Sequence, residues 1–334
     1  GFANYDIDEK RIFEYEHIKG EPQEVKAKNI NPYLVEGNDV TITKKRDAIC
    51  LVPEISFGSM PNDGGGLLLS NEEKEQLILN EPNVQKFIKP LLSAHEFING
   101  EFRWCLWLVD VNPTEIKGSS EIFSRINQVK EHRNNSTRAA TKKLADFPTL
   151  FGENRQPKSD YILIPRHSSE NRVYIPFGFF SSDYIVSDSC LFVANATHYH
   201  FGVLNSLMHM IWVKTVCGRI KSDYRYSNEL VYNNYPFPQS PTDKQKEAVE
   251  KAAQAVLDAR ALFPDSSLAD LYDPNTMPPA LVKAHQQLDK AVDLCYRPQP
   301  FPNETKRIEF LFELYDQYTA GLFIKEKKTK KKKS

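Results

Sequence analysis

The sequence of 334 residues lacks long apolar segments and has few cysteines. No run of about 18 apolar residues occurs, the length that a membrane-spanning helix needs, so we expect no contact with a membrane. The cysteines are odd in number and have no paired spacing, which argues against a disulfide framework or a zinc site. Reduced thiols are typical of the cytoplasm, where we expect this protein. The cysteines are Cys50, Cys105, Cys190, Cys217 and Cys295.

The motifs of common active sites are also missing. No Gly-x-Gly-x-x-Gly follows a strand, and neither Gly-x-x-x-x-Gly-Lys-Ser/Thr nor Gly-x-Ser-x-Gly occurs. His198, His200 and His209 follow Cys190 without a carboxylate at ligand spacing, so we expect a polar strand edge there and no metal. An independent enzyme with an unrecognised metal site is the weakest of three hypotheses. The residues alone show no catalytic centre.

Charge is balanced over the whole chain but unevenly distributed. Lys and Arg number 43 against 44 Asp and Glu, a net charge of -1. The Lys-rich tail, residues 325–334, is expected to be a disordered terminus with non-specific phosphate affinity at most. The remaining chain is mildly acidic, which excludes a protein-wide positive field for attracting nucleic acid.

One local cluster of positive charge lies between Phe123 and Lys143. It contains six Lys and Arg residues against one acidic residue, Glu131. A helix is predicted over 119–144, and its periodicity places several cations on one face, either as a solvated surface or as a contact for phosphates. These cations are Arg125, Lys130, Arg133, Arg138, Lys142 and Lys143.

Hydrophobic patterning predicts an α+β fold with an antiparallel sheet, followed by a small C-terminal helical bundle. The chain begins with Gly and no signal peptide follows, so we interpret it as part of a longer protein. Residues 1–27 resemble a strand hairpin, assigned as a hairpin or linker from a missing domain. Further helices are predicted at 71–79 and 83–92, and strands at 48–52, 103–109, 161–165, 172–177, 189–194 and 229–232.

A proline-rich segment at 236–241 separates this mixed part, residues 28–240, from three predicted amphipathic helices. Ser240, followed by Pro241, is a favourable start for the first helix. The second is predicted over 279–295 and the third from near Asn303. We assign residues 241–324 to a helical domain and 325–334 to the tail.

Six sequence phrases occur in an informative order. Together they resemble the C-terminal half of the MmeI-like (type IIL) DNA methyltransferases and restriction-modification enzymes. The resemblance runs from about Arg11 to Leu322. The phrases are 29–35, 60–65, 103–108, 168–176, 218–227 and 231–238.

The resemblance implies that methylation and DNA recognition are carried out by separate domains. In that family an S-adenosylmethionine-dependent domain methylates the N6 amine of adenine, and a target-recognition domain follows it. This sequence has neither the family's Asn-Pro-Pro-Tyr/Phe motif nor a glycine-rich cofactor loop, and the segment 233–236, Asn-Asn-Tyr-Pro, has the wrong order. The resemblance therefore implies that residues 28–240 recognise double-stranded DNA, without a cofactor of their own. Its implied partner is a missing N-terminal methyltransferase domain.

The resemblance also implies which residues read bases. It places readers at Lys221, Asp223 and Arg225, which point to one side if the segment is extended. Lysine can donate to guanine O6 and N7 while aspartate accepts from cytosine N4, so Lys221 and Asp223 are predicted to read one G·C pair. The alternative for these two residues is a plain surface ion pair beside a hairpin.

Further readers are implied near Arg166 and near Asp188 and Ser189, with Arg166 and Asp188 as a second donor–acceptor pair. Phosphate contacts are predicted for the cations of the 123–143 cluster, and for Arg172 and Arg219 unless these brace loops. The competing functional hypothesis is a protein-interaction module, in which the helices after Ser240 dock a nuclease or methyltransferase subunit.

Overall fold

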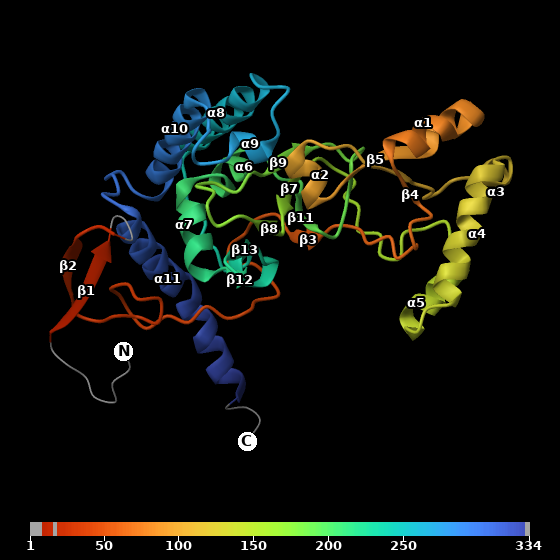
Figure 1. Ribbon diagram of the computed structural model, residues 1–334. Helices are drawn as coiled ribbons and strands as arrows, with labels where there is room; N and C mark the ends of the chain where they lie inside the picture. Colours follow the sequence, from red (N-terminus) through yellow and green to blue (C-terminus); the bar gives the residue numbers. More distant parts are fainter. Residues whose placement is uncertain (1–8, 16–18, 331–334) are drawn as a thin grey trace.

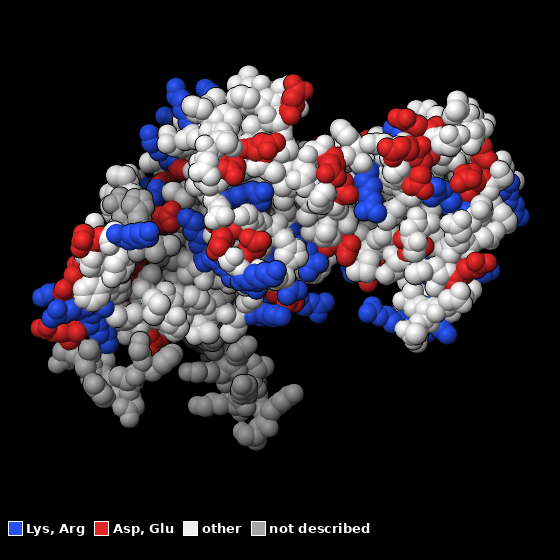
Figure 2. All heavy atoms as spheres, viewed as in Figure 1, with Lys and Arg blue, Asp and Glu red and all other residues white. Residues whose placement is uncertain are grey.

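The computed structural model describes residues 9–15 and 19–330, which form two lobes joined by a central sheet (Figure 1). The larger lobe contains the C-terminal helices, and the smaller lobe contains most of residues 60–155. The lower side of the molecule is hollowed between the lobes (Figure 2). The predicted α+β class is confirmed, because helices and largely antiparallel sheets are combined in one chain.

The central sheet has four antiparallel strands in the order β3-β11-β7-β9. Strands β7 and β11 are apolar and almost entirely buried, so they occupy the middle of the sheet. Their pairing places Pro165 opposite Cys190, so the residues just beyond both strands meet at one edge. The strands are β3 (Ile55–Phe57), β7 (Tyr161–Pro165), β9 (Gly178–Phe180) and β11 (Cys190–Ala194).

The smaller lobe is built on a second sheet, in the order β10-β5-β6-β4, in which the β10–β5 pair is parallel. Its strands are β4 (Leu68–Leu69), β5 (Ile88–Leu92), β6 (Trp104–Leu106) and β10 (Ile185–Val186). Its helices are α1 (Asn71–Asn80), η1 (Pro82–Phe87), α3 (Pro113–Lys117), α4 (Ser120–Asn134), α5 (Ala139–Lys143) and η2 (Leu144–Asp146). Helix α2 (Ala94–Asn99) follows β5 but lies beside the central sheet, where Phe97 packs with Tyr161 and Leu163 (Figure 1).

A third, three-stranded sheet lies beside the central one and has the order β12-β13-β8. It follows two buried helices, so its hairpin is anchored to the core of the larger lobe. The elements are β8 (His167–Ser168), α6 (His198–Leu204), α7 (Leu207–Val216), β12 (Gly218–Ile220), β13 (Asp223–Arg225) and the short π-helix η3 (Asn228–Tyr232).

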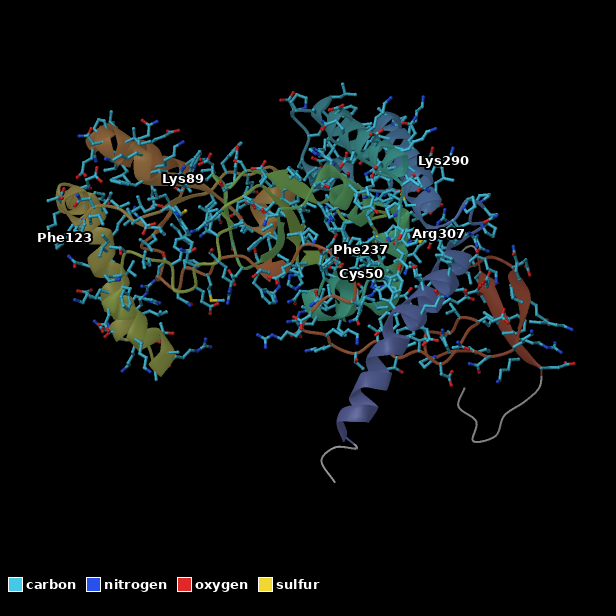
Figure 3. The ribbon with its side chains drawn as sticks, turned by 180° about the vertical axis from the view of Figure 1, so that it is seen from behind. Cys50, Lys89, Phe123, Phe237, Lys290 and Arg307 are labelled. Carbon is cyan, nitrogen blue, oxygen red and sulfur yellow. The ribbon has the colours of Figure 1, made fainter. Side chains whose placement is uncertain are left out.

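The C-terminal helices pack onto the larger lobe as α8 (Asp243–Ala261), α9 (Leu268–Leu271), α10 (Pro279–Tyr296) and α11 (Glu304–Lys330). Asp289 of α10 accepts hydrogen bonds from Tyr174 Oη and Leu207 N, both at 2.7 Å, and burial raises the pKa of its carboxyl group to about 6. Arg307 of α11 forms a 2.6 Å ion pair with Asp293 of α10 (Figure 3). These contacts join the helices to each other and to the preceding lobe.

Strands β1 (Lys10–Tyr15) and β2 (Pro22–Ala27) pair as the predicted antiparallel hairpin. Helix α11 continues to Lys330, so the first six residues of the tail are helical rather than disordered, and 331–334 lie outside the described residues. Within the described ranges, no helix has the length and apolar character needed to cross a bilayer.

Several predicted elements are wrong. Residues 83–92 form η1 and β5 instead of a helix, because Pro82 starts a short turn and Pro90 cannot continue one. The predicted strands at 48–52 and 172–177 are irregular, and 229–232 lies in η3, where Ser227 Oγ accepts from Leu230 N. The 119–144 helix breaks between α4 and α5. Thr242, not Ser240, caps α8.

The histidines expected on a strand edge lie on helices instead. His198 stacks on Phe179, and His200 caps the start of α6. His209 on α7 is buried, and its Nε2 lies 2.9 Å from the hydroxyl oxygen of Tyr226. Tyr226 is the residue that follows β13. Burial lowers the pKa of the His209 imidazole to about 3. The described part of the chain contains no cluster of three or more His, Cys, Asp or Glu residues suited to a metal.

The buried His209 predicts a pH-dependent stability. Its pKa is depressed in the folded state, so between pH 6.5 and 3 the unfolded chain binds a proton that the folded chain does not. Its contribution is complete above pH 6.5 and is lost on acidification, by up to about 1.4 kcal/mol per pH unit. Denaturant unfolding at pH 7 and pH 5 should show a smaller loss in His209→Gln than in the wild type. An equal loss of unfolding free energy in His209→Gln and the wild type would contradict this expectation. His95 is exposed, so the control variant His95→Gln should lose as much as the wild type.

Candidate nucleic-acid interface

A cleft of about 310 Å³ lies where the three-stranded sheet meets the central sheet. Three cations line it: Arg166 beyond the end of β7, Arg225 at the end of β13, and Lys44 from the loop that precedes β3. One carboxylate also lines it, that of Glu229, which pairs with Lys44 at 3.8 Å, so the cleft has an excess of positive charge. Phe57 of β3 adds an aromatic surface. Two predicted base readers, Arg166 and Arg225, are therefore brought together although they are 59 positions apart in the sequence.

Arg166 is held at this cleft through both its main chain and its side chain. Its N–H donates to Ser189 O at 3.2 Å, and its carbonyl accepts from Tyr226 N at 2.8 Å. Its Nη1 donates to Asp188 O at 3.0 Å, and the guanidinium carbon lies 4.9 Å from the Phe57 ring centroid. The guanidinium is therefore fixed in orientation at the edge of the cleft.

Arg166 and Asp188, predicted to read the two bases of one pair as donor and acceptor, contact each other only through the Asp188 main-chain carbonyl. The Asp188 carboxylate instead accepts from Ser187 Oγ at 3.3 Å. Ser189 Oγ accepts from Ala94 N at 2.9 Å, so it holds the start of α2 next to β11. Asp188 and Ser189 thus lie beside Arg166, as the resemblance implies, but their side chains contact other residues.

Strand β13 presents Asp223 and Arg225 to solvent and buries Tyr224 between them. Lys221 is also exposed, but it lies in the turn between β12 and β13 with a left-handed φ of 55°. The expectation that the side chains of residues 221, 223 and 225 point to the same side of one extended strand therefore holds only for Asp223 and Arg225. Asp223 Oδ1 accepts from Glu170 N at 3.2 Å, and its second oxygen accepts no hydrogen bond from the part of the chain that the structure describes.

Arg219 and Arg172 brace this hairpin. Arg219 lies over the Tyr224 ring at 4.2 Å, donates to Ser222 O at 2.8 Å and pairs with Glu170 at 3.6 Å. Arg172 donates to Ser168 Oγ at 3.2 Å, and partial burial lowers the pKa of its guanidinium. Both retain N–H groups near the exposed face of the sheet, so bracing and phosphate contact are compatible.

The expectation that every cation of the 123–143 cluster contacts phosphate is wrong for Arg133, which is 0% exposed. It occupies the buried face of α4, in line with Ile122, Ile126 and Val129. Its guanidinium donates to five main-chain carbonyls at 2.7–3.0 Å, so it cannot reach a phosphate. The accepting residues are Pro61, Asn62, Leu144, Phe147 and Leu150.

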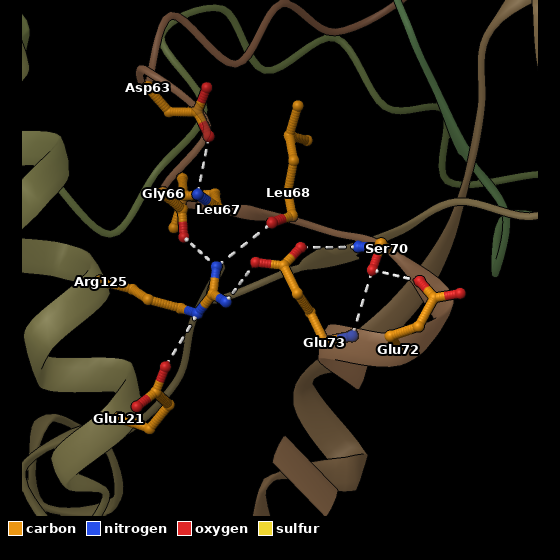
Figure 4. A network of polar contacts seen from close by, with 9 residues as sticks. All are labelled: Asp63, Gly66, Leu67, Leu68, Ser70, Glu72, Glu73, Glu121 and Arg125. Atoms are coloured by element: carbon orange, nitrogen blue, oxygen red, sulfur yellow. Dashed lines mark hydrogen bonds and ion pairs between the residues drawn. The ribbon is translucent and has the colours of Figure 1, made fainter. Parts of the chain in front are cut away.

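Arg125 is engaged in a similar way (Figure 4). Its guanidinium pairs with Glu73 at 2.9 Å and Glu121 at 3.3 Å, and it also donates to Gly66 O and Leu68 O. Only 12% of its side chain is exposed, so it ties α4 to α1 instead of facing DNA. The spacing was a usable signal, since residues 122, 125, 126, 129 and 133 share one helical face.

The other cations of the cluster are exposed: Lys130, Arg138, Lys142 and Lys143. The last three lie at the end of the smaller lobe, in or beside α5. Figure 2 shows Lys and Arg side chains on both sides of the hollow between the lobes, near α5 and below β12 and β13. Positive side chains of both lobes therefore border this hollow.

Sequence reasoning missed Lys44 and Phe57. Lys44 begins a Lys-Lys-Arg triplet that could have marked it as a candidate. Phe57 gave no signal, because an aromatic residue in a three-residue strand is ordinarily part of a core. It became a candidate only when the register of β3 on β11 placed it against Arg166.

Known families match this chain in two consecutive parts. The model described as "MmeI, target recognition domain" matches residues 36–239, and the one described as "MmeI, C-terminal domain" matches residues 241–323. DNA methyltransferase A of Bacillus subtilis (strain 168) is 40% identical over 291 residues, which are 87% of this chain and 33% of that protein. The chain belongs to the family of MmeI-type target-recognition regions.

A solved structure gives the same assignment. It is that of the type IIL restriction-modification enzyme MmeI in complex with DNA, with a TM-score of 0.84 and 46% sequence identity. The alignment covers 95% of this chain and 42% of the MmeI chain. The present chain thus spans less than half the length of either relative.

The buried position of Arg133 predicts a structural role. Replacing it with alanine leaves five partly buried carbonyls without their donor, so we expect Arg133→Ala to lower the free energy of unfolding by about 2–4 kcal/mol. The exposed Lys130→Ala on the same helix should change it by less than about 0.5 kcal/mol. Urea denaturation measures both, and equal stabilities for the two variants would contradict the buried role.

Proposed function

We propose that this chain recognises a specific sequence in double-stranded DNA for a restriction-modification DNA methyltransferase. The observation that carries the proposal is the cationic cleft, where Arg166 and Arg225 converge beside the exposed Asp223. Guanidinium groups can donate two hydrogen bonds to guanine, and a carboxylate can accept from cytosine. Membership of the MmeI target-recognition family supports the same function.

Base readout is assigned to two groups of side chains. Lys221 and Asp223, at the tip of the β12–β13 hairpin, read one G·C pair at the edge of the site. Arg225 and Arg166 read from the cleft, with Asp188 and Ser189 beside them. Because Asp223 keeps one carboxylate oxygen free of the Glu170 contact, it retains the acceptor that cytosine N4 requires.

Phosphate contacts are assigned to exposed cations and to the half-buried Arg172, and they position the duplex without specifying its sequence. The set comprises Lys130, Arg138, Lys142, Lys143, Arg172 and Arg219. Arg125 and Arg133 do not belong to it, because main-chain carbonyls and carboxylates occupy their donors. The hollow then accommodates the duplex between the two lobes.

Catalysis is assigned to a methyltransferase domain that precedes this chain in the parent protein and uses S-adenosylmethionine. An adenine N6 inside the base stack is inaccessible, so that domain flips the adenine out while this chain holds the duplex. The β1–β2 hairpin exposes Phe13 and Tyr15 and is our candidate contact with that domain. Such an enzyme acts on the cell's own DNA, hence in the cytoplasm.

The test is selection from a random duplex library by the 334-residue chain. We expect the wild type to enrich one motif, with affinity that falls steeply with salt because bound counterions are released. The double variant Lys221→Glu, Asp223→Arg should enrich a motif with one G·C pair inverted, since the donor and acceptor have changed places. Discrimination at that pair should be worth about 1–3 kcal/mol in both proteins.

Lys290→Ala is the matched control, because Lys290 lies on α10, away from the cleft (Figure 3). It should select the wild-type motif. A wild-type chain that enriches no motif and shows no salt dependence would refute DNA recognition and favour a protein-interaction module. An unchanged motif in the double variant would refute only the assignment of Lys221 and Asp223.

A further inference from the structure

We infer that Phe57 is a positioning residue that sets the sequence specificity of Arg166. The inference rests on the proposed function, and it assigns a role to a side chain that contains no hydrogen-bonding group. Phe57 lies on β3, whose register against β11 pairs it with Leu191. The sheet therefore fixes the ring at the cleft, where the Arg166 guanidinium carbon lies 4.9 Å from the ring centroid.

The position of Arg166 is determined from three directions. Its main chain bonds to Ser189 and to Tyr226, which belong to the central and the three-stranded sheet regions, respectively. One Nη1 hydrogen is taken by Asp188 O at 3.0 Å. The Phe57 ring then limits rotation of the guanidinium plane, because arginine is attracted to an aromatic face. The remaining N–H groups make no hydrogen bond with the described part of the chain.

A second arginine near the same ring provides an internal comparison. The guanidinium carbon of Arg155 lies 6.0 Å from the Phe57 centroid, but Arg155 also donates to Gly58 O and forms an ion pair with Glu153. Arg166 forms no ion pair with a described carboxylate. Of the two cations beside Phe57, Arg166 is therefore the one whose charge is available to a ligand.

This arrangement has a consequence for specificity. A guanidinium that is already oriented loses little freedom when it forms two parallel hydrogen bonds to guanine O6 and N7. Without the ring, Arg166 can still reach the base pair but also adopts orientations that suit other bases. Phe57 therefore contributes to discrimination at the base pair read by Arg166 and to no other pair.

The experiment compares motifs selected from a duplex library by the 334-residue chain and its variants. We expect Phe57→Leu to reduce discrimination about fivefold at one base pair and to leave the other positions unchanged. Arg166→Lys, which keeps the charge but not the plane, should weaken the same position. Phe57→Tyr should retain the wild-type motif. In the Arg166→Ala background, Phe57→Leu should have no further effect, because the two residues act together.

Phe147→Leu, an exposed aromatic residue of the smaller lobe, is the control and should not alter the motif. Loss of discrimination at every position in Phe57→Leu, or additive effects with Arg166→Ala, would overturn the inference and indicate a merely structural role. So would a Phe57→Leu motif identical to that of the wild type. A wild-type chain that selects no motif overturns the proposed function, and this inference with it.

Discussion

The antiparallel pairing of β7 with β11 is the constraint on which the candidate interface depends. The register ends with Pro165 opposite Cys190, so Arg166 and Ser189 emerge at the same edge and bond through their main chains. Strand β3 adds Phe57 to that edge, and Tyr226 attaches the β12–β13 hairpin to it. Because the strands are buried on both faces, a shift of one residue would turn their apolar side chains away from their partners and displace every residue of the cleft.

The smaller lobe depends on a different interaction, the burial of Arg133. A fully buried arginine costs desolvation unless its donors are satisfied, and here five carbonyls from two loops meet that requirement. The same contacts hold Leu144 and Phe147, which follow α5. A cation that looks like a phosphate ligand in the sequence therefore organises the support on which the exposed cations Arg138, Lys142 and Lys143 are displayed.

The sequence predicted correctly the elements whose apolar residues follow an uninterrupted or a helical pattern. Strands at 161–165 and 189–194 are uninterrupted buried runs, and α8 and α10 have clear apolar stripes, so pattern and structure agree. The prediction failed at 172–177 and 229–232, where tertiary contacts bury most of the apolar residues without forming strands, although Val173 is exposed. For the site, ordered phrases identified the hairpin around Lys221. The burial of Arg125 and Arg133 could have been inferred from the helical face that they share with the apolar residues of α4. Phe57 could not be found in this way, because its contact with Arg166 depends on how β3 pairs with β11.

The central claim is that the three-stranded sheet of β8, β12 and β13, together with Arg166, contacts the bases, while the C-terminal helices support this sheet. Amide hydrogen exchange of the chain with and without the duplex that it selects tests this directly, because bound DNA slows exchange at the amides that it covers. The account predicts protection in residues 166–168 and 218–225 and no change in α8 and α10. Protection confined to α8 and α10, with unchanged exchange in the hairpin, would contradict it.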